Sequence, residues 1–287
     1  MIQSYKLRRT VANILIYAIL IIMCLIWISP FVYLVLHSLR ADGGNVTYNH
    51  LIPREYTLDN YIALFNVKGA ASINFPRWFL NTLGVAACSC VISTISQLAV
   101  AYTLSRLRFG ARKKLMNVGM ILGMFPGFMT MIAMYYLLDA MHLTRTLIAL
   151  VICYSCGAGL GFQISKGFFD TIPRALDEAA TIDGANKNQI FWKIILPMSK
   201  PIVVYTVLTT FIGPWCDFIL AKIIMGDVRD NYTVAIGLQI MTTPEFMQGY
   251  FKQFLAGSVC VAVPITILFL RMQKFYVEGV TAGGVKG

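Results

Sequence analysis

The sequence predicts an all-α integral membrane protein, and two properties of the chain support this fold class. Of its 287 residues, 57% are hydrophobic and only 13% are charged, and the mean hydropathy is +0.68. Soluble domains carry about a quarter charged residues, so this composition lies well outside their range. The charged residues also occur mainly in short stretches between long apolar runs. A chain with this pattern is expected to cross a lipid bilayer several times.

Six stretches are long and apolar enough to cross a hydrocarbon layer of about 30 Å, which takes roughly 20 helical residues. They are residues 14–36, 78–104, 115–138, 147–165, 202–224 and 255–271. The first stretch follows the basic start MIQSYKLRR, but it is longer than the apolar part of a signal peptide, and no small-residue cleavage site follows it. We therefore expect an uncleaved first span and six transmembrane helices.

The positions of Lys and Arg predict the orientation of these helices. Most of the 24 Lys and Arg residues precede the first stretch or follow the second, fourth and sixth stretches. Positive residues favour the cytoplasmic side, so we expect both termini in the cytoplasm. The net charge of +11 does not indicate nucleic acid as a partner, because the basic residues lie in short connectors rather than on a broad polar surface.

The chain lacks the patterns of common catalytic, nucleotide and metal sites. It contains no G-x-x-x-x-G-K-[S/T] loop, no H-E-x-x-H helix and no G-x-S-x-G elbow. Cys153 and Cys156 have CxxC spacing, but no second pair or nearby His completes a zinc site. Asp217 is the only carboxylate well inside a predicted span, whereas an intramembrane hydrolase needs paired groups. We therefore expect no catalytic residue, metal or cofactor in this chain, and transport as its function.

One long polar segment interrupts the apolar pattern: DEAATIDGANKNQIFWKIILP, residues 177–197. Pro173 suits the first turn of a helix, and Asp183-Gly184 indicates a turn, because Gly readily takes the left-handed conformation. The first helix has a small apolar face, and the second has a larger one and is expected to end at Pro197. These faces comprise Leu176, Ala179, Ala180 and Ile182, then Ile190, Phe191, Ile194 and Ile195.

Two interpretations of this pair of helices remain open on pattern alone. An amphipathic helix pair can lie on the membrane surface. Alternatively, it can dock into a groove on a cytoplasmic partner. Ala179, Ala180 and Gly184 are small residues that permit close approach of another backbone, which suits the second interpretation.

The segment resembles the signature E-A-A-x-x-x-G-x9-I-x-L-P of permease subunits in binding-protein-dependent ABC importers. Glu178-Ala179-Ala180, Gly184 and Ile194-x-Leu196-Pro197 match it without departure. Other stretches are similar to the carbohydrate branch of this family, particularly the maltose and maltodextrin permeases. These stretches are PRWFLNTLGVA, AYTLSRLRFGARKK, MFPGFM, KGFFDTIPRALDEAATIDGA and KFYVEGVTAGGVKG.

The resemblance implies a type I ABC importer permease fold. Residues 1–76 would form an N-terminal span and external loop. Residues 77–287 would form a core with five spans, a cytoplasmic coupling loop at about 168–200 and a C-terminal tail at 272–287. The end of this tail lacks helix patterning, and contact with an ATPase and disorder are both open for it. The residues implied in coupling to the ATPase are Glu178, Ala179, Ala180, Asp183, Gly184, Ile194, Leu196 and Pro197.

The resemblance also implies the partners and the location of the chain. A second homologous permease, a cytoplasmic ABC ATPase dimer that carries ATP and Mg, and an external sugar-binding protein would assemble with it in a bacterial inner membrane. The substrate would be a carbohydrate, expected to be a malto-oligosaccharide. The alternative is an ion-coupled secondary transporter of small solutes, but such proteins show repeated halves and several intramembrane carboxylates, and neither is clear here.

The fifth stretch contains the candidate substrate path. Gly213-Pro214 removes a backbone hydrogen bond near Thr210, so we expect a kink there, and broken helices in membranes usually line cavities. Trp215 and Asp217 follow directly, and they suit the apolar face and the hydroxyl groups of a sugar. The alternative is that Asp217 pairs with a neighbouring helix or caps the outer end of the kinked span.

Overall fold

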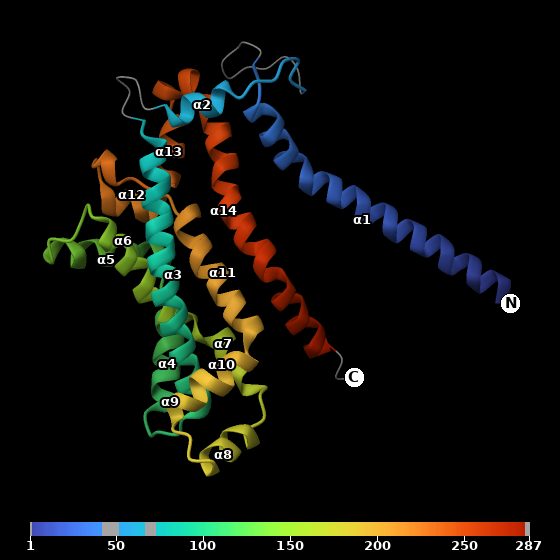
Figure 1. Ribbon diagram of the computed structural model, residues 1–287, viewed down its shortest axis with the longest axis vertical. Helices are drawn as coiled ribbons and strands as arrows, with labels where there is room; N and C mark the ends of the chain where they lie inside the picture. Colours follow the sequence, from blue (N-terminus) through green and yellow to red (C-terminus); the bar gives the residue numbers. More distant parts are fainter. Residues whose placement is uncertain (1, 42–51, 67–72, 285–287) are drawn as a thin grey trace. The chain divides into compact units, whose positions relative to one another are not determined.

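The computed structural model describes residues 2–41, 52–66 and 73–284, and these ranges form helices and connecting turns (Figure 1). The chain divides into two compact units. The first comprises Met1–Lys68 and Ile240–Cys260, and the second comprises Gly69–Gln239 and Val261–Gly287. Part of the expected external loop, residues 42–51 and 67–72, lies outside the described residues.

The first unit contains α1 (Ile2–Ser38), α2 (Asp59–Phe65) and the start of α14 (Pro244–Gly284). The predicted first span lies within α1, and the most apolar 18-residue window of its Arg8–Ser38 stretch has no buried residue, whereas His37 and Ser38 at its end are buried. Polar contacts join the end of α1 to α2, because the side-chain amide of Asn60 donates to the carbonyl oxygens of Ser38 and Arg40, at 2.9 Å each. The apolar length of α1 is therefore available to lipid or to another subunit.

The second unit is built around α3 (Phe75–Arg106), which corresponds to the predicted span 78–104. Asn74 begins this helix by accepting the backbone N–H of Arg77 at 3.2 Å, and Pro76 occupies the first turn, where a missing N–H costs nothing. Helices α6, α7 and α11 pack against α3 (Figure 1).

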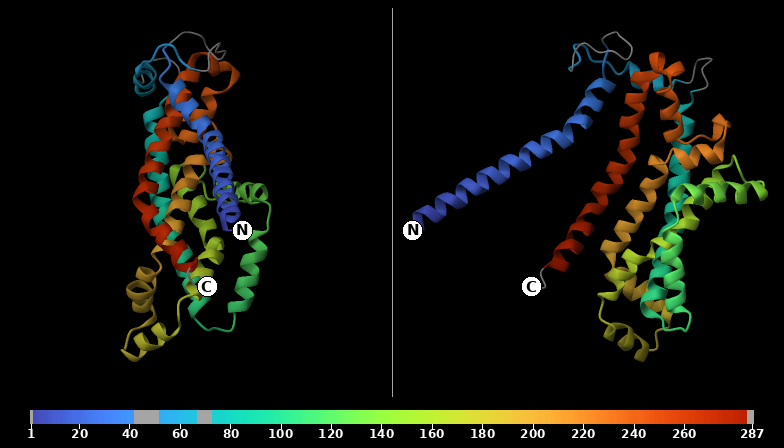
Figure 2. Two further views of the ribbon diagram at one scale, coloured as in Figure 1. Left: turned by 90° about the vertical axis from the view of Figure 1, so that its right-hand side faces the viewer. Right: turned by 180° about the vertical axis from the view of Figure 1, so that it is seen from behind.

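The predicted span 115–138 is bent rather than straight, and its two helices are long and apolar enough together to cross a membrane. The chain forms α4 (Arg112–Gly123) and α5 (Gly127–Ala140), which meet at an angle of 99° (Figure 2). Pro126 stands between them in an extended conformation, with ψ of 124°. Because Pro has no N–H and disfavours a helical conformation in the residue before it, the first helix ends here.

The predicted span 147–165 is also interrupted. It consists of α6 (Leu147–Cys156), a 3₁₀ helix η1 (Gly157–Gly161) and the start of α7 (Phe162–Asp170). The side-chain amide of Gln97, on α3, donates to the carbonyl oxygen of Gly161 at 3.0 Å and to the Ser165 hydroxyl at 3.2 Å. This amide thereby satisfies a backbone carbonyl that the irregular turn exposes.

The fifth predicted span breaks three residues later than the sequence suggests. Helix α11 (Lys200–Cys216) continues through Pro214, and α12 (Ile219–Met225) begins after Asp217. The Asp217 carboxylate, one residue before the N-cap Phe218, accepts the backbone N–H of Leu220 at 3.1 Å. It thereby satisfies one of the free backbone N–H groups in the first turn of α12.

The remaining helices are η3 (Arg229–Asn231), α13 (Val234–Met241) and α14, which is longer than the predicted span 255–271. The tail, expected to lack helical structure, is helical through Gly284, and residues 285–287 lie outside the described part. Within the described ranges, three helices are long and apolar enough to cross a membrane, and two bent pairs pass the same test together. Six spans and two cytoplasmic termini therefore stay predictions.

Candidate functional site

The 168–200 segment has the predicted form of two short helices around a turn. Helix α8 (Ala175–Ile182) and α9 (Lys187–Ile190) flank Gly184, whose φ of +85° lies in the left-handed region. Glycine adopts this conformation without the steric cost that other residues meet. Asn186 and Gln189 then form a capping box, with two hydrogen bonds of 2.9 Å between side chain and backbone.

The second helix of the segment extends beyond the predicted end. A π-helical turn η2 (Phe191–Ile195) and α10 (Leu196–Met198) continue α9, so Pro197 begins a turn rather than ending the helix. The chain changes direction at Ser199, where the axis of residues 187–198 meets that of α11 at 87°. The segment therefore crosses the end of α11 nearly at a right angle.

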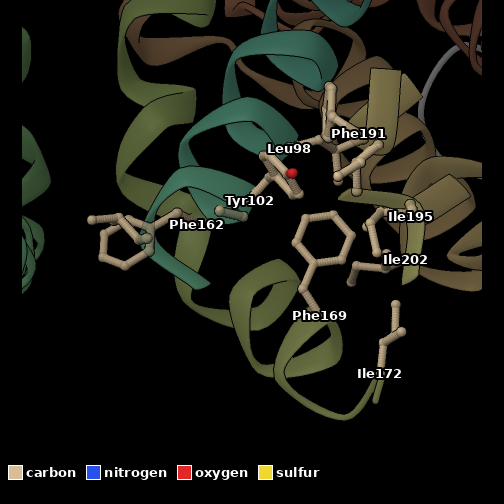
Figure 3. Close-up of a cluster of buried hydrophobic side chains, with 12 residues drawn as sticks. Leu98, Tyr102, Phe162, Phe169, Ile172, Phe191, Ile195 and Ile202 are labelled. Atoms are coloured by element: carbon tan, nitrogen blue, oxygen red, sulfur yellow. The ribbon is translucent and has the colours of Figure 1, made fainter. Parts of the chain in front are cut away.

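The inner face of the segment is part of the hydrophobic core of the second unit (Figure 3). Its buried side chains meet Leu98 and Tyr102 of α3, and full burial of one large apolar side chain contributes about 1.5–3 kcal/mol. A rigid attachment of the segment follows from this packing. The buried members from the segment are Phe169, Ile172, Ala180, Ile190, Phe191 and Ile195.

The outer face presents most of the residues that the family signature contains. Ile194 and Leu196 are half-buried against the core, and Ala180 is buried. The exposed signature residues are Glu178, Ala179, Gly184 and Pro197, and Asp183, which stands within the signature at a position that it leaves open, is exposed too. The signature thus combines residues that hold the segment with residues that remain free to meet a partner.

Ile182 differs from the sequence expectation. The pattern places it on the apolar inner face of the first helix, but its side chain is 86% exposed at the end of α8. A large apolar side chain this exposed, two residues before the turn glycine, is available for burial against another protein. The spacing of apolar residues does not predict the exposure of Ile182, because α8 ends at this residue and the turn changes the direction of the chain.

A cleft of about 840 Å³ separates the segment from the connector after α3. Both basic and acidic side chains line the cleft, so its surface carries charges of both signs. The residues that line it are Arg106, Leu107, Arg108, Phe109, Arg174, Asp177, Glu178, Thr181, Ile182 and Lys187.

Asp170, at the end of α7, links the segment to α3. Its burial opposes ionisation, but hydrogen bonds from Lys166 and Ser105 outweigh this effect and hold the pKa of Asp170 below its ordinary value. A carboxyl group with a lowered pKa stabilises the folded state above its ordinary pKa. That contribution is lost as the pH falls through the lowered value. The contact is therefore intact at neutral pH.

Two of the candidate substrate-path residues, Thr210 and Trp215, lie in the second half of α11, and Asp217 directly follows its last residue. The Thr210 hydroxyl lies 3.3 Å from that of Thr94 on α3 and also donates to the Thr206 carbonyl at 2.7 Å. Trp215 is only 2% exposed, and its ring meets that of Phe79 edge-on at 5.2 Å. Its indole N–H has no hydrogen-bond partner among the described residues.

Asp217 is fully engaged by the protein itself. One carboxylate oxygen accepts the backbone N–H of Leu220, and the other accepts the Tyr154 hydroxyl from α6 at 3.1 Å. Both structural roles left open for Asp217, pairing with a neighbouring helix and capping, are therefore present. Tyr154 carried no signal in the sequence, because nothing in an apolar helix marks one tyrosine as the partner of a residue 63 positions away.

Among the described residues, no cluster of three or more His, Cys, Asp or Glu side chains has the arrangement of a metal site. Cys153 is buried and Cys156 is exposed, and both are free thiols.

Comparison with known proteins identifies the family. The model of the binding-protein-dependent transport system inner membrane component matches residues 97–281. The chain belongs to this family. The permease is also 31% identical, over all of both chains, to the galactooligosaccharides transport system permease protein GanQ of Bacillus subtilis (strain 168). It is 33% identical to the maltodextrin transport system permease protein MalD of Streptococcus pneumoniae, over 99% of each chain.

The fold of the permease is also found in a solved structure. A chain of a bacterial ABC transporter involved in the import of the acidic polysaccharide alginate superposes with a TM-score of 0.78 and 21% identity. The superposition covers 93% of the permease and 96% of that chain. The resemblance carried by the 178–197 signature is thus confirmed at the level of the family, as is an all-helical permease fold in the described residues.

Proposed function

We propose that this permease is the membrane-spanning subunit of an ATP-driven sugar importer, in which the 168–200 segment receives movement from a separate ATPase subunit. One observation carries this proposal: the segment has a buried face fixed in the core and an exposed face on which the small residues Ala179 and Gly184 flank Ile182, whose side chain is 86% exposed. A simple connector between two helices needs neither face.

The exposed face indicates what the ATPase must offer. Ala179 and Gly184 permit close approach of a partner backbone, and Ile182 requires an apolar socket. Moving Ile182 from water into such a socket would contribute about 1.5–3 kcal/mol, a large share of the energy of a small interface. The partner is therefore a protein with an apolar groove, as in helix-in-groove recognition.

Movement at the segment would then reach the membrane helices as rigid-body motion. The inner face packs on α3, α7 and α11, so closure of an ATPase pair would turn these helices together. ATP can drive this change only if it binds one state of the ATPase pair better than the other. Alternating access of a central path to the two sides of the membrane is the proposed consequence.

The proposed substrate is a malto-oligosaccharide, delivered by an external binding protein to a path shared with a second permease subunit. Relatives named for maltodextrin and galactooligosaccharide transport match along the full length of the chain, which supports an oligosaccharide. Among the path candidates, Trp215 is the one proposed to touch sugar, because its ring is apolar and its N–H is unpaired among described residues. Thr210 and Asp217 are proposed to shape the wall, and alternating access must uncover the Trp215 ring.

The test is an Ile182→Asp substitution in the full complex, reconstituted in liposomes with its ATPase, second permease and binding protein. We expect import of radiolabelled maltotriose to fall at least tenfold, because a charge replaces the apolar anchor, while the exposed position leaves folding unaffected. Ile182→Leu is the matched control and should retain import. Normal ATP-driven import by the Asp variant would refute the docking proposal, and ATP-independent import by the wild type would refute the proposed function itself.

A further inference from the structure

The last turn of α3 makes polar contacts with successive parts of the 168–200 segment. The Ser105 hydroxyl donates to the Asp170 carboxylate at 2.6 Å, at the end of α7. The Tyr102 hydroxyl donates to the backbone carbonyl of Lys187 at 3.2 Å, at the start of α9. The segment is therefore attached to α3 near its start and again at its second helix, although α3 neither directly precedes nor directly follows it in the chain.

Arg106 makes the central contact of this set. Its Nη2 atom donates to the carbonyl oxygens of Phe169 at 2.6 Å and Ile172 at 2.8 Å. Its Nη1 atom donates to the Asp177 carboxylate at 3.0 Å. The Phe169 carbonyl belongs to the last turn of α7, where partial negative charge accumulates, and Ile172 follows two residues after the helix ends, whereas Asp177 stands in the first turn of α8. One guanidinium thus joins the end of one helix to the start of the next.

The ion pair of Arg106 and Asp177 is largely buried, and each side chain leaves one polar atom without a hydrogen bond among the described residues. The exposed fractions of the two side chains are 4% for Arg106 and 15% for Asp177. Arg106 Nε and Asp177 Oδ1 have no partner among the described residues. A buried ion pair with unsatisfied atoms adds little net stability, because the loss of hydration offsets the attraction. The apolar cluster already holds the segment, so stability alone does not account for the pair.

The guanidinium of Arg106 fixes the distance and direction of the segment relative to α3, which the apolar cluster does not. Apolar packing tolerates small changes of angle, whereas a planar fork that binds three oxygen atoms fixes both distance and direction. We propose that Arg106 is a positioning residue for ATP-coupled transport: it fixes the 168–200 segment to α3, so that movement of the segment is imposed on α3 directly. This inference rests on the function proposed above.

Helix α3 leads from this attachment toward the candidate substrate path. Thr94, twelve residues before Arg106, lies about 18 Å along the helix at 1.5 Å per residue. Its hydroxyl is 3.3 Å from that of Thr210, and the neighbouring Ser93 donates to the carbonyl of Tyr154 at 3.2 Å. A rigid α3 therefore connects the segment with the residues that hold the bend at Asp217. Without Arg106, the segment would still bind the ATPase, but α3 would follow its movement incompletely.

The experiment measures sugar imported per ATP hydrolysed by the full complex in liposomes, with radiolabelled maltotriose and galactotriose as parallel probes. We expect Arg106→Gln to lower this ratio about tenfold, with ATPase binding within twofold of wild type. Arg106→Lys keeps the charge but not the fork, and should recover part of the ratio. The matched control is Arg108→Gln, which removes an exposed charge from the same cleft and should leave the ratio within twofold.

A double variant separates positioning from folding. Arg106→Met with Asp177→Leu replaces the buried pair by apolar side chains of similar volume, a change that often leaves stability intact. We expect normal assembly and a ratio still reduced about tenfold. A wild-type ratio in this variant would overturn the inference. Failure of both the Gln and the double variant to assemble would also overturn it, because Arg106 would then be a structural requirement only.

Failure of this inference is distinguishable from failure of the proposed function. If the proposed function is wrong, the wild-type complex will not couple import to ATP, or Ile182→Asp will import normally. If only the role of Arg106 is wrong, both of those results will be as expected. The contradiction will then appear in the Arg106 variants alone.

Discussion

At the scale of single residues, Asp217 holds the bend between α11 and α12 through both of its carboxylate oxygens. Asp217→Leu is expected to lower the yield of folded subunit, because it removes a helix cap that contributes about 0.5–2 kcal/mol. It also leaves the Tyr154 hydroxyl without its acceptor. Asp217→Asn keeps an acceptor for the Leu220 N–H and should fold nearly as well as the wild type.

Gel filtration of the detergent-solubilised subunit measures this yield, and Tyr154→Phe isolates the contact between helices. A Leu variant that folds at wild-type yield but fails to import sugar would contradict the structural role. It would place the Asp217 carboxylate in contact with substrate instead.

Gly184 allows a second prediction at the residue scale. Its φ of +85° disfavours most side chains, but no atom lies within 4 Å of the position of an added Cβ. Asn tolerates this conformation better than most residues, so Gly184→Asn should keep part of the import activity. Gly184→Asp introduces a side chain of about the size of Asn, but with a negative charge, at the exposed turn. It should leave membrane insertion intact while lowering the amount of sugar imported per ATP hydrolysed. Equal import ratios for the Asn and Asp variants would show that charge at this turn is irrelevant to coupling.

At the scale of elements, α13 packs on α3 through a glycine. A Cβ at Gly237 would stand 2.0 Å from the Trp78 ring, which is only 1% exposed and donates its N–H to the Arg229 carbonyl at 2.9 Å. Gly237→Ala must therefore displace a fixed indole, and overpacking of this kind costs about 1–3 kcal/mol. We expect a lower thermal unfolding temperature for the purified subunit.

Gly84→Ala is the matched control for this prediction. It lies on α3, and no atom is within 4 Å of the added Cβ. Because alanine favours helix more than glycine does, its unfolding temperature should equal or exceed that of the wild type. A Gly237→Ala variant as stable as Gly84→Ala would contradict the contact between α13 and α3.

The elements also show which structural features the sequence can predict. The helices around Gly184 are predictable, because a turn residue between two apolar-periodic stretches indicates them locally. The 99° bend at Pro126 is not predicted, because hydropathy averages over about 19 residues and does not register a change of direction. The break in the fifth stretch is predicted from Gly213-Pro214, three residues before its actual position. The Arg106–Asp177 pair joins residues 71 positions apart, and neither residue carries a local signal of the other.

At the scale of the whole molecule, the long apolar helices and the family signature agree on a membrane permease that works with other subunits. Helix α1 has no buried part within its membrane-length window, and the outer face of the 168–200 segment exposes Ile182. Surfaces of this kind are stable only against lipid or protein. These surfaces support the proposal that the permease works in an assembly, in which an ATPase binds the 168–200 segment.

Protection of an introduced cysteine tests this claim most directly. Ile182→Cys, in vesicles that expose the cytoplasmic side, should react quickly with a membrane-impermeant maleimide when the permease is alone. Reaction should slow at least tenfold when the ATPase is bound. Lys114→Cys on α4, an exposed control, should react at the same rate in both cases. Equal reactivity of residue 182 with and without bound ATPase would contradict the account.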